Sequence, residues 1–223
     1  MLPPMATRSL MMALLIAGTG SAASGDLEAV QDSSHRHAES SVINAMSIDV
    51  EEYFQVWAFA DVSKQSQWDS FESRVEGSIA KALQLFDDAN VKATFFTLGW
   101  IAERYPEMVR RIVDNGHELA SHGWEHVRVT NQTAPELRED VKNTRDLLED
   151  IGGQQIKGYR AASYSIGRTN LWALDVLADE GYRYSSSIVP VHHDLYGMPE
   201  APRFPFSAAD GRLLEIPVTT LKL

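Results

Sequence analysis

Three carboxylates lie within four residues of one another, directly after an apolar segment of the chain. They are Asp49, Glu51 and Glu52. In an extended chain alternate side chains share a face, so Asp49 and Glu51 point the same way if the strand continues past Asp49. One of these two carboxylates can then bind a cation while the other stays free to accept a proton. The alternative is a solvated acidic loop on an acidic protein.

Two histidines form a second group, in the run Ser121-His122-Gly123-Trp124-Glu125-His126. Histidines at i and i+4 fall on one face of a helical turn, where they can share one metal ion. The pattern is not the zincin motif, which needs glutamate directly after the first histidine. His117 lies off that face, and we expect it to be a structural histidine at the start of a strand.

Arg160 is the third group, and an arginine at a strand end can pair with a carboxylate and fix its orientation. A plain salt bridge is the alternative.

A carboxylate and two histidines leave one position of a metal ion open for water, as in catalytic zinc sites. The ion activates this water and polarises a carbonyl oxygen, and the free carboxylate takes the proton. The three groups therefore predict hydrolysis of an amide or ester without a covalent enzyme intermediate.

Alternating strands and helices are expected to position these groups. Strands are predicted over residues 42–48, 93–98, 117–121, 156–160 and 213–218. Helices are predicted over 79–86 and 106–114, after a capping box at Thr133 until Gly152, and over 169–180. Residues 50–77 read as a long structured loop rich in aromatic residues, which either line a groove or belong to the core. The pattern predicts an α/β fold with a largely parallel sheet, whose strand ends carry the three groups.

The composition narrows the class of protein. The 223 residues carry a formal net charge of −11, which argues against a nucleic-acid binder. There is no cysteine, so disulfides, thiolate nucleophiles and cysteine zinc sites are excluded. With 44% hydrophobic and 23% charged residues, the chain suits one soluble globular domain.

The first residues differ from the rest of the chain. Arg8 precedes a short apolar run over residues 10–17, and small residues follow it. This order predicts a signal peptide over residues 1–25, too short to span a membrane, and hence a periplasmic or secreted protein. With a mis-assigned start codon instead, the protein would be cytoplasmic. Residues 26–41 are polar and aperiodic and are expected to be a flexible linker, which leaves 42–223 as the folded domain.

Several runs of residues, in their order along the chain, resemble one known family. They are residues 46–56, 93–100, 116–126, 158–161, 184–190 and 193–197. The chain is similar to the polysaccharide deacetylases of the NodB type, carbohydrate esterase family 4. Within that family it most resembles the subgroup encoded beside exosortase and exopolysaccharide genes.

This resemblance implies a distorted (β/α) barrel and metal-dependent removal of acetyl groups from an N-acetylated polysaccharide. It implies Asp49 as catalytic base and Arg160 as the residue that orients this base. It also implies His122 and His126 as ligands of a divalent ion, most simply zinc. Glu51 is the expected acidic ligand, with Glu52 in reserve.

The chain departs from the family pattern at several positions. Ser185 and Ala162 stand where the family usually has Asp and often has Pro, and the family's late Leu-x-His segment, which supplies the general acid, has no counterpart. We therefore expect the domain to be incomplete at its C-terminus and poorly active by itself, unless His193 or another group replaces the acid. Two other functions stay open: action on a small cyclic amide or formamide, and carbohydrate binding without catalysis.

Overall fold

A seven-stranded sheet is the scaffold of the part that the computed structural model describes, residues 44–221. Its strands follow the spatial order β1-β2-β3-β4-β5-β7-β6. The strands from β2 to β7 pair in parallel, and β6 pairs antiparallel with β7. This confirms the predicted α/β class with a largely parallel sheet. The strands are β1 (Met46–Val50), β2 (Ala93–Thr97), β3 (Glu118–Ser121), β4 (Gly158–Tyr159), β5 (Tyr184–Ser185), β6 (Phe206–Ala208) and β7 (Leu213–Glu215).

One row of buried residues crosses the sheet where its parallel strands end. Each member is the last residue of its strand and is paired with the next: Thr97, Ser121, Tyr159, Ser185 and Glu215. All five are at most 1% exposed. Because parallel strands end at one edge of the sheet, the residues that follow them meet there. This edge gathers the ionisable groups that the sequence singles out.

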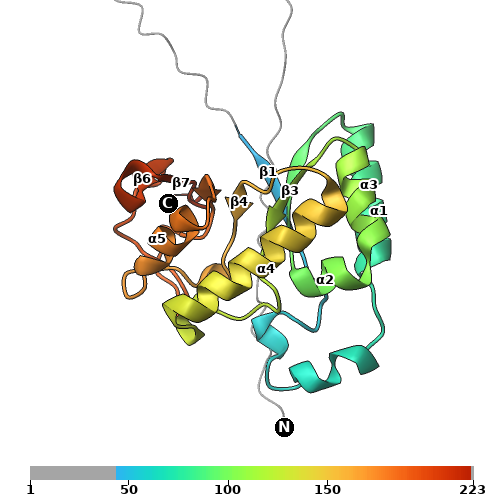
Figure 1. Cartoon of the computed structure of the whole chain (residues 1–223), viewed down its shortest axis with the longest axis horizontal. Helices are drawn as coiled ribbons and strands as arrows, with labels where there is room; N and C mark the ends of the chain where they lie inside the picture. Colours follow the sequence, from blue (N-terminus) through green and yellow to red (C-terminus); the bar gives the residue numbers. More distant parts are fainter. Residues whose placement is uncertain (1–43, 222–223) are drawn as a thin grey trace, which may run out of the picture. The chain divides into compact units, whose positions relative to one another are not determined.

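Residues 44–221 form five α-helices: α1 (Val75–Asp88), α2 (Gly99–Arg104), α3 (Pro106–Asp114), α4 (Ala134–Gly152) and α5 (Trp172–Asp179). The longest, α4, runs between the α1–α3 side and α5 and packs against α2, α3, α5 and β3 (Figure 1). Its face Leu137, Val141 and Leu148 is fully buried. Burial of each such side chain contributes about 1.5–3 kcal/mol to stability. The predicted capping box at Thr133 is present, and Gly153 ends the helix in a left-handed conformation.

Several elements differ from their predicted bounds. β1 begins at Met46, later than expected, and extends to Val50. β7 stops at Glu215, because Pro217 has no backbone N–H to continue the ladder. α5 begins only at Trp172, since Asn170 uses its side chain to close a turn with Gly167 N–H and the Ser165 carbonyl. The short elements α2, β5 and β6 were not predicted, because two to six residues are too few for a periodic pattern.

The aromatic loop between β1 and α1 contains two short 3-10 helices, Trp57–Phe59 and Gln65–Ser70. Its aromatic residues differ in burial. Phe54 and Trp68 are buried, where they pack on each other and on Trp100. Tyr53, Trp57 and Phe59 are 38–45% exposed. The loop therefore contributes to the core and also leaves aromatic surface uncovered.

The predicted signal peptide (1–25) and linker (26–41) lie outside the described residues. Within residues 44–221, none of the helices combines the length and apolar character that a membrane crossing requires.

Candidate metal centre

Glu51, His122 and His126 come together at the sheet edge. One ligand atom from each lies within 4.8 Å of the others. Glu51 Oε2 is 2.9 Å from His126 Nε2, and the two side chains are 18% and 6% exposed. The three residues come from two segments about 70 positions apart, so the tertiary fold is what joins them.

The hydrogen bonding of His122 leaves one ring nitrogen available as a ligand. Its Nδ1 lies 2.8 Å from the Arg160 carbonyl oxygen, so Nδ1 carries the proton and donates it. Its Nε2 is buried and has no hydrogen-bond partner. Burial lowers the pKa of His122 and outweighs the opposing effect of Asp49 and Glu51, so the ring is neutral. A buried lone pair without a partner is costly, and a metal ion would satisfy it.

Glu51 supports the same conclusion. Its Oε2 is buried and close to His126 Nε2, yet the two groups lack the alignment of a hydrogen bond. Burial alone would lower the pKa of His126, but the charges of Glu51 and Asp49 outweigh burial and raise it. The site therefore favours positive charge. Two histidines, one carboxylate and an unpartnered lone pair fit a divalent ion such as zinc.

The segment that carries both histidines is a loop, and the predicted helical turn is wrong. Gly123 has φ +78° and His126 has φ +56°, and neither value occurs in a right-handed helix. The loop is joined to the start of α2 by two backbone hydrogen bonds. They run from the N–H groups of Gly99 and Trp100 to the carbonyls of Gly123 and Trp124. The left-handed conformation is free at glycine but costs energy at histidine. The turn brings the two imidazole centroids to 5.3 Å.

Asp49 is held beside this cluster by Arg160. The Arg160 Nη1 donates to Asp49 Oδ1 at 2.7 Å, and Asp49 Oδ2 lies 4.0 Å from His122 Nε2. Burial alone would raise the pKa of Asp49, but the pKa is lowered, above all by the positive charge of Arg160 and by its hydrogen bond. Asp49 is therefore ionised at neutral pH, with one oxygen anchored and the other facing the histidines.

Glu52 lies outside the cluster, although it directly follows Glu51. It is 1% exposed, and its Oε1 accepts hydrogen bonds from the Ser73 hydroxyl at 2.5 Å and from Arg74 and Val75 N–H at 2.9 and 3.1 Å. Consecutive residues of an extended chain point to opposite faces, which separates the two glutamates. Glu52 therefore caps the start of α1.

The other histidines that the sequence singled out lie elsewhere. His117 is 5% exposed, accepts a hydrogen bond from Ala93 N–H at 3.2 Å, and contacts Phe95. This agrees with a structural role. His193 stacks on Tyr196 with ring centroids 3.9 Å apart, and Tyr196 contacts Tyr164. His193 is thus linked to Arg160 through the rings of Tyr196 and Tyr164.

Two residues at the site were missed in the sequence. Tyr164 lies with its ring 5.5 Å from the Arg160 guanidinium carbon, and burial followed by Asp49 raises the pKa of Tyr164 to about 12. Its position only four residues after Arg160 could have indicated from the sequence that it lies near the site. Ser186 accepts two hydrogen bonds from Arg160. Nothing in a run of three serines distinguishes this one.

Asp140 of α4 supports the histidine loop and gives a pH-dependent prediction. It accepts Trp124 N–H at 2.6 Å, and Gln132 and Thr144 also contact it. Burial raises the pKa of Asp140 to about 6 despite these hydrogen bonds. Because the pKa of Asp140 is higher in the folded than in the unfolded protein, its protonated form stabilises the fold. This stabilisation is complete below the unfolded pKa near 3.8 and is lost as pH rises through 6.

We expect Asp140→Asn to remove this loss, because the amide oxygen can still accept Trp124 N–H without a charge. The melting temperature of the variant minus that of the wild type should rise between pH 5 and 7.5 and then level off. The corresponding free energy is about 1–3 kcal/mol. Thermal unfolding of both proteins across this range measures it. A constant difference would show that Asp140 is ionised at little cost.

Comparison with known proteins finds a family match in the segment that carries most of these site residues. Residues 60–185, which include His122, His126 and Arg160, match the family Polysaccharide deacetylase. Residues 186–223 match a domain of unknown function (DUF3473). Asp49 and Glu51 precede both matched segments.

Individual relatives agree with the family match. The chain is 30% identical over 120 residues to a peptidoglycan deacetylase of Helicobacter pylori, covering 53% of this chain and 39% of that protein. It is 33% identical over 96 residues to a peptidoglycan-N-acetylglucosamine deacetylase of Bacillus cereus, covering 43% of this chain and 35% of that protein. The chain thus spans well under half of the length of either relative.

A solved structure extends the likeness to the fold. A crystal structure described as a polysaccharide deacetylase from Mycobacterium smegmatis superposes with a TM-score of 0.61 and 25% identity, over 78% of this chain and 58% of that one. This agrees with the predicted barrel of the deacetylase type. The family match covers more than half of the residues, in the segment that carries both histidines and the arginine. The chain therefore belongs to the polysaccharide deacetylase family.

Proposed function

We propose that this chain is a metal-dependent hydrolase that removes N-acetyl groups from a polysaccharide, with zinc as the ion. The observation that carries the proposal is the buried, unpartnered Nε2 of His122, which lies with Glu51 and His126 beside an ionised Asp49. Glu51, His122 and His126 would hold the ion. When bound, a divalent ion supplies Lewis acidity to a carbonyl oxygen and to water.

The chain's own residues have separate roles in the proposed reaction. Water attacks the acetamide carbonyl carbon, and the C–N bond breaks with its electron pair going to nitrogen. The nitrogen takes up a proton in place of the one that water loses, so acetate and a free amine result. Asp49 accepts the proton of the attacking water at Oδ2, because Oδ1 is engaged by Arg160. Arg160 holds Asp49 ionised and fixes its orientation. The Nδ1–H of His122 bonds to the Arg160 carbonyl, so one residue positions both the base and a ligand.

The substrate we propose is an N-acetylated glycan, in an exopolysaccharide or cell-envelope setting. The two relatives named above are peptidoglycan deacetylases, which act on such glycans. The exposed rings of Tyr53 and Phe59 follow Glu51 closely in the chain, and aromatic faces suit sugar rings. We also propose a periplasmic or secreted location, on the signal-like pattern of residues 1–25.

Metal removal tests the proposed function. We expect the full-length protein to release acetate from N-acetylated oligosaccharides, to lose this activity after chelation, and to regain it with zinc. Acetate is measured directly, and metal content is measured on the same samples. Activity that survives complete chelation would contradict the metal site. Turnover of a cyclic amide or formamide without acetate release, or glycan binding without turnover, would replace the deacetylase with one of the alternative functions.

A further inference from the structure

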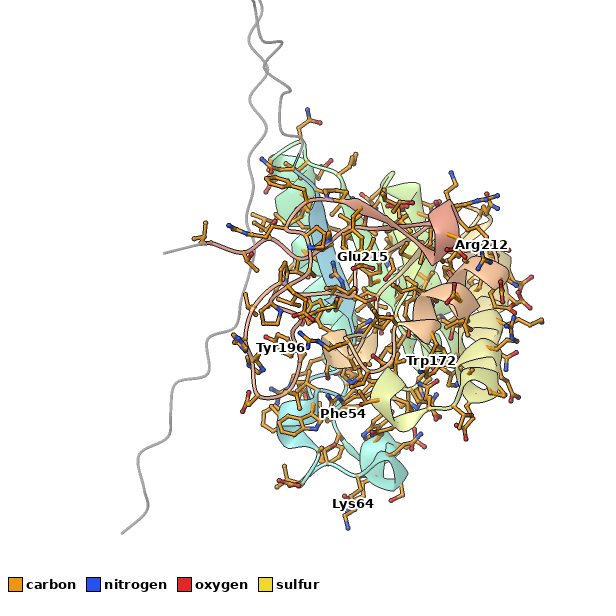
Figure 2. The ribbon with its side chains drawn as sticks, turned by 90° about the vertical axis from the view of Figure 1, so that its left-hand side faces the viewer. Phe54, Lys64, Trp172, Tyr196, Arg212 and Glu215 are labelled. Atoms are coloured by element: carbon orange, nitrogen blue, oxygen red, sulfur yellow. The ribbon has the colours of Figure 1, made fainter. Side chains whose placement is uncertain are left out.

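Glu215 is a buried carboxyl group that the proposed reaction does not use. It is the last residue of β7, is fully buried, and pairs in register with Ser185 of β5. Figure 2 shows Glu215 in the interior of the ribbon, whereas Arg212, three residues earlier, lies toward its edge. A buried carboxyl group is costly unless its oxygens accept hydrogen bonds. Its partners therefore indicate why it is there.

The partners of Glu215 are backbone groups of the segment that follows β5. Its Oε1 accepts the N–H of Ser187 at 2.9 Å and that of Ile188 at 2.8 Å. The Ser187 hydroxyl in turn bonds to the Ser185 hydroxyl and accepts Ala161 N–H. One carboxylate oxygen thus fixes two consecutive peptide groups and, through Ser187, the residue after Arg160.

Ser186 lies inside this fixed segment and holds Arg160. Its carbonyl oxygen accepts from Arg160 Nε at 3.1 Å, and its hydroxyl accepts from Arg160 Nη2 at 3.0 Å. Arg160 is 6% exposed and uses its remaining Nη1 on Asp49 at 2.7 Å. The contacts therefore form one continuous path from β7 to the base.

We propose that Glu215 is a positioning residue, which holds Arg160 through Ser186 and so aims the carboxylate of Asp49. The proposal rests on the assigned roles of Asp49 and Arg160. It gives residues 186–223, whose family has no assigned function, a specific task in this chain: the segment supplies both Ser186 and Glu215 to the catalytic edge.

Two substitutions separate the hydrogen bonds of Glu215 from its charge. Glu215→Gln keeps an oxygen that can accept from Ser187 and Ile188, whereas Glu215→Ala removes it. We expect Glu215→Ala to lower kcat by about 10–100-fold with KM nearly unchanged, as for other residues behind a catalytic group. We expect Glu215→Gln to retain activity within about 3-fold of the wild type, since the two N–H groups keep an acceptor. Leu214→Ala changes an exposed neighbour on the same strand and is the matched control.

A second readout does not depend on turnover. In 15N NMR spectra the buried Nε–H of Arg160 should give a signal that is protected from exchange with solvent. Glu215→Ala should make this exchange at least about 10-fold faster. Glu215→Asp keeps the charge but shortens the reach. It serves if the alanine variant does not fold, and it should show the same faster exchange of Arg160.

The outcomes distinguish this inference from the proposed function. Unchanged Arg160 exchange in folded Glu215→Ala or Glu215→Asp would overturn the positioning role. Loss of activity in Glu215→Gln equal to that in Glu215→Ala would also overturn it, because charge would then matter and not the two hydrogen bonds. Faster Arg160 exchange in a protein that releases no acetate would support the role of Glu215 and reject the deacetylase.

Discussion

Asp49→Asn is expected to lower acetate release by at least about 10²–10⁴-fold, the usual contribution of a positioned general base, while metal content stays the same. The amide has nearly the shape of the carboxylate, so its oxygen can still accept from Arg160 Nη1. It cannot take a proton from water. Steady-state kinetics and metal analysis on the same preparation of full-length protein measure the two quantities.

The metal measurement makes this prediction specific. The cluster of Glu51, His122 and His126 does not include Asp49, so removal of the Asp49 charge should leave three ligands in place. If Asp49→Asn loses its metal, then Asp49 is a ligand and the base is another residue. If turnover changes less than about 10-fold, proton transfer by Asp49 is not the function of this carboxylate.

The neighbouring glutamates give the second prediction, with opposite outcomes for adjacent residues. We expect Glu51→Gln to weaken zinc binding by at least about 100-fold, beyond the 10–100-fold usual for a partner behind a ligand. A neutral amide is a poor ligand, and the negative charge that raises the pKa of His126 is lost with it. Titration of the metal-free protein with zinc measures the affinity.

Glu52→Gln is the matched control for this experiment. It makes the same chemical change one residue later, where the carboxylate accepts from Ser73, Arg74 and Val75 at the start of α1. We expect zinc affinity to be preserved and the free energy of unfolding to fall by about 1–3 kcal/mol. The assignment of Glu51 would be refuted by the reverse pattern, in which Glu52→Gln loses the metal and Glu51→Gln keeps it.

The sequence by itself identified most of the ionisable residues that the structure brings together at this site. Strand and helix periodicity predicted the α/β class and placed Asp49, His122 and Arg160 at strand ends, and parallel strands end at one edge. The spacing of His122 and His126 predicted that their side chains lie together, although through a helical turn that the structure does not have. These features are local or depend on simple alternation, so they can be read without the fold.

Only the tertiary structure decided which neighbours these residues have. The choice of Glu51 over Glu52 follows from the direction of each side chain and from the position of α1, which takes up Glu52 as its cap. The backbone conformation of His126 could not be predicted from the sequence, for a related reason. His126 has a positive φ in a loop whose Gly123 and Trp124 carbonyls accept hydrogen bonds from the start of α2, and no local sequence pattern predicts this conformation.

The residues that hold Arg160 in place were the least predictable from the sequence. Ser186 and Glu215 lie 26 and 55 positions after Arg160. Ser186 directly follows the two-residue strand β5, which carries no periodic signal, and Glu215 is the last residue of β7. Their contacts arise because β5 lies between β4 and β7 in the sheet. Sequence sets which side chains are able to donate, accept or ligate. The pairing of distant strands sets which of them meet, because backbone hydrogen bonds between strands are made by residues of any type.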